Sequence, residues 1–169
     1  MSNIFNRLEL QAFKAGITPR TAESRKWFQQ KAKNLRSINR TELMKEEPIK
    51  RKSNEVVGGM YMFIYDPKHK DTLPFYDRFP LTIISGPAEG GFYGMNLHYL
   101  PPVLRAKALD ALLGEGELPM KFIKPTIHRY LTKHVKSRFA LVDKPEWEIA
   151  TFLPTQDFRK ASSGTVYRD

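Results

Sequence analysis

The spacing of apolar positions changes near residue 56 of the chain. Upstream, apolar side chains recur every three or four residues, which is typical of amphipathic helices. A first helix is predicted over residues 3–15 and ended by Gly16, and a second is predicted to start at Thr18 or Thr21, because threonine caps helix N-termini. The second helix carries a narrow apolar stripe: Phe28, Ala32, Leu35 and Ile38. A helix with so narrow a stripe is expected to lie on a surface.

Downstream of a polar linker at residues 45–55, runs of apolar and aromatic residues predict strands. Three strands are predicted over residues 56–65, 79–85 and 92–100, separated by a turn at Asp66-Pro67 and by the glycine-rich GPAEGG. In the third strand, one alternating set of side chains is uniformly apolar and is predicted to face the core: Tyr93, Met95, Leu97 and Tyr99.

The second half of the chain mixes helical and strand patterns. PPVLRAKALDALLG predicts a helix, with Pro102 in its first turn and Gly114 just past its end. KPTIHRYLTKHVKSRF predicts another, because five of its side chains follow helical spacing: Ile127, Tyr130, Leu131, His134 and Val135. Two further strands are predicted over residues 138–142 and 146–154.

This order of elements favours an α+β fold. We expect a small antiparallel sheet that could curl into a partly open barrel, with a two-helix insertion and a basic helical N-terminal arm in front. The corresponding division is an arm and linker at residues 1–54, an α+β body at residues 55–154 and a C-terminal tail at residues 155–169.

Composition narrows the class of protein. The 169 residues are 41% hydrophobic and 12% aromatic, which is enough for one buried core. No run of about 18 apolar residues exists, so no membrane span is expected. The absence of cysteine excludes disulfides and thiolate metal sites. The N-terminus lacks the apolar core of a secretory signal, so export by that route is not expected.

The net charge of +10 is concentrated in the arm. Residues 1–54 hold thirteen Lys/Arg and five Asp/Glu, a net charge of +8, whereas residues 55–169 carry only +2. A basic arm on a nearly neutral body favours a polyanionic partner, either nucleic acid or an acidic protein surface. The competing interpretation is a solvated helix face.

The stretch GGMYMFIYDPKHKDTLPFYDRFPL holds the most plausible metal ligands: Asp66, His69, Asp71 and Asp77. Their spacing matches no compact ligand motif, and Asp-Pro commonly opens a turn. We therefore predict a turn and no metal or other cofactor.

A metal-dependent nuclease would need an acid and an Asp-x-Lys pair on a strand. The one such triplet that follows a strand is Asp66-Pro67-Lys68, with Glu55 as the upstream acid, and a proline at its centre disfavours strand structure. His128 and His134 lie six residues apart, which does not suit a shared zinc ion. No catalytic residue is predicted, and we expect the protein not to be an enzyme.

The segment MYMFIYD is apolar on both faces of its predicted strand. Such a strand is either central in a core or half covered by a partner. We predict a protein interface formed by five aromatic side chains: Trp27, Phe28, Tyr61, Phe63 and Tyr65.

Four segments in order carry a family resemblance: MYMFIYDPKHKDTLPFYDRFPL, GFYGMNLHYLPPVLRAKALDALL, IHRYLTKHVKSRF and EWEIATFLPTQDF. Over about residues 13–165 the chain resembles small proteins of large contractile-tailed phages, both T-even-like and marine. These proteins are described as DNA end protector or head-completion proteins.

The resemblance implies a virion protein, made in the host cytoplasm during assembly, that completes the packed head. It would be oligomeric, contact portal, neck or tail proteins, and bind the end of duplex DNA without reading sequence. It implies no membrane and no active site. The expected phosphate ligands form an arm set and a second patch: Arg20, Arg25, Lys26, Lys33, Arg36 and Arg40, and then Arg129, Lys133, Lys136 and Arg138.

Two alternatives stay open. The first is a head–tail connector or tail component that does not bind DNA, whose basic arm lies on an acidic protein surface. The second is a head-completion nuclease that uses Asp66 and Lys68.

Overall fold

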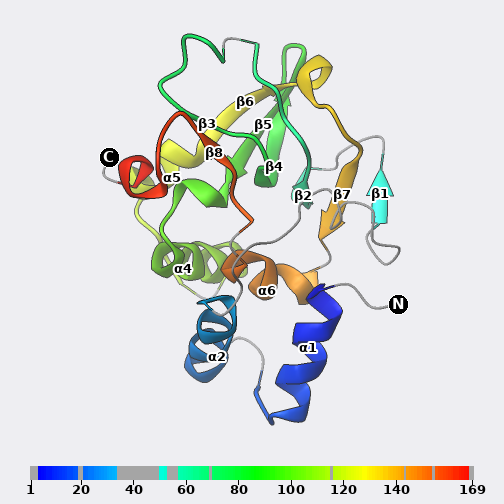
Figure 1. Cartoon of the computed structure of the whole chain (residues 1–169), viewed down its shortest axis with the longest axis vertical. Helices are drawn as coiled ribbons and strands as arrows, with labels where there is room; N and C mark the ends of the chain where they lie inside the picture. The colour runs from blue at the N-terminus through cyan, green and yellow to red at the C-terminus, as the bar shows by residue number, and fades with distance from the viewer. Residues whose placement is uncertain are drawn as a thin grey trace.

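An antiparallel sheet occupies one end of the molecule, and the longer helices gather at the other (Figure 1). The computed structural model describes residues 4–18, 21–33, 50–52, 57–68, 70–114, 116–142, 144–153 and 155–167. Within these residues the main sheet has six strands, in the order β1 (Lys50–Lys52), β7 (Phe139–Val142), β2 (Met60–Met62), β4 (Leu81–Ala88), β5 (Gly91–Asn96) and β6 (Ile127–Leu131). A small second sheet pairs β3 (Tyr76–Asp77) with β8 (Phe158–Arg159).

The helices are α1 (Ile4–Lys14), α2 (Ala22–Lys33), α4 (Pro102–Leu112), α5 (Met120–Ile123), α6 (Trp147–Phe152) and α7 (Ser163–Val166). Short 3-10 turns connect them: η1 (Leu97–Tyr99), η2 (Lys124–Thr126), η3 (Thr132–His134) and η4 (Lys144–Glu146). The α+β class is therefore confirmed. The described strands form an open sheet with β1 and β6 at its edges, and they do not close into a barrel.

The helix ends predicted at Gly16, Thr21 and Gly114 are confirmed. Gly16, just past α1, has φ +74°, and Gly114, just past α4, has φ +76°. Thr21 caps α2, because its Oγ1 accepts from the Ser24 backbone N–H at 3.1 Å while the Ser24 hydroxyl accepts from the Thr21 N–H at 3.0 Å. These local signals place the helices without reference to tertiary contacts.

The N-terminal helices pack on the rest of the chain. Leu8, Ala12 and Phe28 are buried in the main hydrophobic core, where α1 and α2 contact α6. The Ser24 hydroxyl also donates to the buried Glu148 carboxylate at 3.1 Å. Helices that share a core with residues far along the chain cannot be removed without exposing it, so deleting the arm is a poor test of the arm's charge.

Strand β2 separates two apolar clusters. Met60 and Met62 face the helices and join the main core, whereas Tyr61 and Phe63 face the opposite side and join a second, aromatic cluster. There the Phe63 ring lies edge-on to its neighbours, with its centroid 5.2 Å from that of Phe139 and 5.5 Å from that of Tyr130. The double-sided apolar pattern of β2 thus marks a central strand.

The helix predicted for KPTIHRYLTKHVKSRF, residues 124–139, is wrong. Residues 127–131 form β6, paired antiparallel with β5 from Met95↔Ile127 to Gly91↔Leu131, and η3 follows. The open hydrogen-bonding edge of β5 is the reason, because it offers partners that the sequence alone does not show. Tyr130 and Val135 still reach the aromatic cluster, through an extended segment and a turn. In the described part of the insertion, only α4 is a multi-turn helix.

The strand predicted over residues 146–154 is also wrong, because residues 147–152 form α6. All six of its residues are buried, and α6 contacts α1, α2 and α4. The apolar residues of so short a segment fit a buried strand and a buried helix equally well, so periodicity could not separate them.

The core face predicted for residues 92–100 is wrong in β5. Phe92 and Asn96 are buried, whereas Tyr93 is 43% exposed. Asn96 and the nearby His98 are fully buried, because both form a hydrogen bond with one carboxylate. Their polar side chains therefore gave no indication in the sequence that they are buried.

That carboxylate belongs to Asp77, which is 3% exposed. Its Oδ2 accepts from His98 Nδ1 at 2.7 Å and from Asn96 Nδ2 at 2.9 Å, and its Oδ1 accepts from the backbone N–H groups of Phe79 and Asp157. Burial by itself would raise the pKa of Asp77, but His98 and these hydrogen bonds hold that pKa below its ordinary value of 3.8. The His98 Nε2 is hydrogen-bonded to the Thr155 hydroxyl at 3.0 Å.

A buried arginine supports the same region. Arg105, 1% exposed, donates from Nε to the carbonyls of Leu97 and Leu100 and from an Nη to the hydroxyl of Tyr167. Burial lowers its pKa. Arg105 and Asp77 together hold η1 and the C-terminal residues in place.

The β5–β6 pair should depend on Gly91. A Cβ at this position would lie 1.8 Å from the Tyr130 carbonyl oxygen, so Gly91→Ala must push the strands apart. We expect a loss of about 1–3 kcal/mol in the free energy of unfolding, measured by urea denaturation. Gly86→Ala is the matched control, because a Cβ there meets nothing within 4 Å. Equal effects of the two variants would contradict this account of the edge.

The Asp77 network should set the acid limit of stability. Because the folded-state pKa of Asp77 is lowered, its contribution is present above pH 4 and is lost as pH falls through the folded-state value. Asp77→Asn should lower the free energy of unfolding at pH 7 by about 3–5 kcal/mol and flatten its fall below pH 4. Exposed Asp71→Asn should do neither. If the free energy of unfolding of Asp77→Asn still falls steeply below pH 4, Asp77 does not set the acid limit of stability.

Candidate nucleic-acid interface

A row of exposed cations follows the outer strand β6 and the turn after it. Arg129, Lys133, Lys136 and Arg138 are all exposed, and we call them the basic edge. Arg129 stands opposite Tyr93 in the strand register, and Tyr93 is itself exposed. Alternation along β6 therefore turns Arg129 outward while Tyr130 is buried.

The backbone beneath the basic edge is anchored. The Lys136 N–H donates to the Ile64 carbonyl at 2.8 Å, and the Ile64 N–H donates to the Ser137 hydroxyl at 2.8 Å. Val135 also forms a β-bridge with Tyr65. The cations are thus presented by a fixed scaffold, and less ordering of the chain is needed on binding.

The arm cations have mixed surroundings. Lys26 is exposed, whereas Arg25 forms an ion pair with Asp110 of α4. Charge reversal at Arg25 would set two carboxylates side by side, so it cannot serve as a neutral probe of binding. The side chain of Lys33 and all of Arg20, Arg36 and Arg40 lie outside the described residues, as do Leu35 and Ile38 of the predicted stripe.

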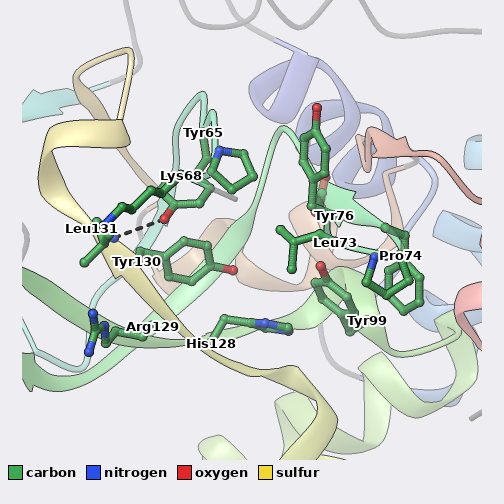
Figure 2. A pocket seen from close by; sticks show the side chains of 13 residues that line it. Tyr65, Lys68, Leu73, Pro74, Tyr76, Tyr99, His128, Arg129, Tyr130 and Leu131 are labelled. Atoms are coloured by element: carbon green, nitrogen blue, oxygen red, sulfur yellow. Dashed lines mark hydrogen bonds between the residues drawn. The ribbon is translucent and has the colours of Figure 1, made fainter. Parts of the chain in front are cut away.

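An aromatic pocket of about 450 Å³ adjoins the basic edge at Arg129. Figure 2 shows Tyr130 and His128 of β6 on one side of it, Leu73 and Tyr76 on the other, and Tyr99 next to His128. Its walls come from residues 65–68, 73–77, η1 and 128–131. Lys68 and Arg129, both exposed, are the cations of this lining.

The rings that line the aromatic pocket are uncharged at neutral pH, and the Asp77 carboxylate in its wall is enclosed in its own hydrogen bonds. Burial lowers the pKa of His128, whose Nε2 donates to the Pro125 carbonyl at 3.0 Å. Burial raises the pKa of Tyr65 and of Tyr99, so both phenols stay protonated. The Tyr65 hydroxyl accepts from the Leu131 N–H at 3.1 Å, and the Tyr99 ring centroid lies 4.3 Å from that of His128. The pocket therefore combines neutral rings with cations from its exposed lining residues.

The predicted protein interface does not agree with burial. Tyr61, Phe63 and Tyr65 are 0–7% exposed and form the aromatic cluster behind the pocket. Phe28 is 6% exposed in the main core, and Trp27 packs partly buried against the same core. Their apolar character is explained by packing within the chain, which a double-sided apolar pattern also permits.

The metal-ligand candidates considered from the sequence do not form a shared site among the described residues. Among the described residues no group of three His, Cys, Asp or Glu could hold a metal ion, and His69 lies outside them. Asp66 pairs with Lys70 at 3.0 Å in the turn predicted at Asp66-Pro67, and Asp77 is enclosed in its network.

Hydrogen bonds link Asp77 to His98 and His98 to Thr155, as an acid, a histidine and a hydroxyl are linked in a hydrolase triad. All three residues are buried, at 0–3% exposed. A substrate could not reach the Thr155 hydroxyl in this structure. The described part of the chain also contains no helix long and apolar enough to cross a membrane.

Sequence reasoning found the cations of the basic edge but assigned them to a helix, and it missed the aromatic pocket. The sequence did contain a signal for the pocket: the segments LPFYD and IHRYL are rich in aromatic residues, and each has a cation within it or next to it. Spacing could not show that the two segments face each other.

Comparisons with known proteins give one finding. A family model described as phage T4 terminal DNA protecting protein matches residues 3–117. No curated protein and no solved structure matches the chain. The matched range covers the arm, β2 to β5 and α4, more than half of the chain. The resemblance predicted from sequence is thereby confirmed: the chain belongs to the family of the phage T4 terminal DNA protecting protein.

Proposed function

We propose that this protein binds the terminal segment of packaged duplex DNA, independently of sequence, and shields the end while completing the phage head at the portal or neck. Family membership supports the phage structural role and the protection of DNA ends. The observation that carries DNA binding is the basic edge, a row of exposed cations on anchored backbone. Virion location, assembly in the host cytoplasm and oligomerisation are parts of the same proposal.

The binding would be chiefly electrostatic. Lysine and arginine side chains that neutralise phosphates release condensed counterions, so affinity falls with salt. The basic edge lies on an outer strand and a turn, with no helix to enter a major groove, which suits backbone contact without base readout. Exposed arm cations such as Lys26 would add further phosphate contacts.

Protection would come from occupancy of the end rather than from catalysis, so we propose that the protein is not an enzyme. Asp66, the candidate nuclease acid, is paired with Lys70. The Asp77–His98 pair is used for structure and is closed to substrates.

A specific feature favours a protein contact in addition to DNA binding. Phe13 and Leu10 on α1 are 79% and 53% exposed, opposite the buried Leu8 and Ala12 of the same helix. Apolar side chains on an outward helix face are a common docking surface. The connector role, with α1 against a portal or neck protein, is therefore the second candidate.

Salt dependence tests the basic edge directly. Neutralising Lys133, Lys136 and Arg138 to glutamine should make the slope of log affinity against log salt less negative by about 2–3. Binding of a short blunt duplex, measured by fluorescence anisotropy at several salt concentrations, gives the slope. The matched control neutralises Lys107, Lys124 and Lys144, three exposed cations elsewhere, and should change the slope less. The connector candidate leads if the two triple variants behave alike.

End protection and catalysis can be tested separately on the same blunt duplex. Full-length protein should slow exonuclease digestion of a blunt duplex and should bind a hairpin-closed duplex of equal length more weakly. Incubation with magnesium or manganese should yield no cleavage products, beside an Asp66→Ala control. Metal-dependent cleavage that disappears in Asp66→Ala would replace this proposal with the nuclease.

A further inference from the structure

The aromatic pocket has the size for one nucleotide and not for a duplex. Its volume of about 450 Å³ falls within the range of small-molecule sites. The bases of a double helix are paired and stacked inside the duplex, so a base can enter a pocket of this size only after it has been extruded. Whatever part of DNA occupies this pocket must first leave the base-pair stack.

The lining offers rings to an unstacked base. Tyr76, Tyr99 and His128 are partly exposed, which leaves ring surface available for stacking. They come from three separate segments: Figure 2 shows Tyr76 across the pocket from Tyr130, and Tyr99 next to His128, with ring centroids 4.3 Å apart. Base–aromatic stacking is tolerant of sequence, because every base has a π face.

The lining cations complement a phosphate. Arg129 belongs both to the basic edge and to the pocket lining, where its side chain lies at the rim, on the opposite face of β6 from His128 and Tyr130 (Figure 2), so a DNA strand held by the edge would pass beside the pocket. Lys68 lines the same pocket and is exposed. Neutral rings joined by exposed cations suit a nucleotide better than an apolar side chain of a protein, which would gain nothing from two cations.

We propose that the aromatic pocket takes the terminal nucleotide of one DNA strand, with its base against Tyr76, Tyr99 and His128 and its phosphate near Arg129 and Lys68. This inference rests on the proposed function and deepens it. A terminal base pair has a stacking neighbour on one side only, so unpairing it is less costly than flipping an interior base. The pocket thus supplies selectivity for ends without any readout of sequence.

The test combines two DNA changes with two protein changes, in full-length protein. Blunt duplexes carry a normal terminal nucleotide or an abasic residue at the 5′ or 3′ terminus. Wild-type protein should lose about tenfold in affinity when one of these termini is abasic. Tyr76→Ala should lose about tenfold on the normal duplex and little more on the abasic one, whereas Tyr76→Phe should keep wild-type behaviour.

Tyr93→Ala is the matched control, because Tyr93 is an exposed ring on the neighbouring strand and outside the pocket lining. It should respond to the abasic terminus as wild type does. Leu73→Trp, which fills the pocket from a partly exposed position, provides a second variant should Tyr76→Ala fail to fold. It should also abolish the discrimination.

Two failures are distinguishable. Equal wild-type affinity for blunt and hairpin-closed duplexes would overturn end binding itself, and the pocket inference with it. Preference for blunt ends without any loss on abasic termini at either strand would overturn the pocket inference alone. The pocket would then be assigned to a side chain of a partner protein.

Discussion

The Asp77 carboxylate is where distant parts of this chain are joined. It binds Asn96 at the end of β5, His98 in η1 and the backbone of Asp157 near β8. An unpaired carboxylate at this depth would be strongly destabilising, whereas one that accepts several hydrogen bonds fixes the position of each donor. β3, η1 and the C-terminal segment surround this carboxylate. The hydrogen bonds that it accepts therefore determine where these segments lie.

The candidate interface inherits its shape from that network. Asp77 and Tyr76 are adjacent in β3, and Tyr99 follows His98 in η1, so two walls of the aromatic pocket are held by the same hydrogen bonds. The third wall is β6, held by pairing with β5 that requires the bare Cα of Gly91. A buried polar group on one side and a close strand approach on the other fix the walls of the pocket, and the rings of Tyr99 and His128 meet where two of these walls join.

Charge and shape have separate roles in the proposed activity. Cations on the basic edge act at a distance and do not distinguish one duplex segment from another. The pocket acts only at contact and admits only a nucleotide that has left the stack. Placing Arg129 in both features links general attraction to DNA with recognition of its terminus. Retention of a DNA end during packaging would use both.

Local chemistry in the sequence determined several elements correctly. Thr21 and Gly16 marked helix ends, Pro102 and Gly114 bounded α4, and the apolar run before Gly86 became the strand β4. The concentration of cations was equally readable, because formal charge does not depend on folding. These features rest on interactions between residues close in sequence, or on composition alone.

The tertiary structure decided what non-local contacts control. Residues 127–131 became a strand because β5 had a free edge, and residues 147–152 became a helix enclosed by other helices. Asn96 and His98 are buried because Asp77, about twenty residues earlier, accepts their hydrogen bonds. The aromatic pocket exists because β6, η1 and β3 meet around that carboxylate. Pairing between distant residues has no periodic signature in sequence, which is why only the folded chain brings this site together.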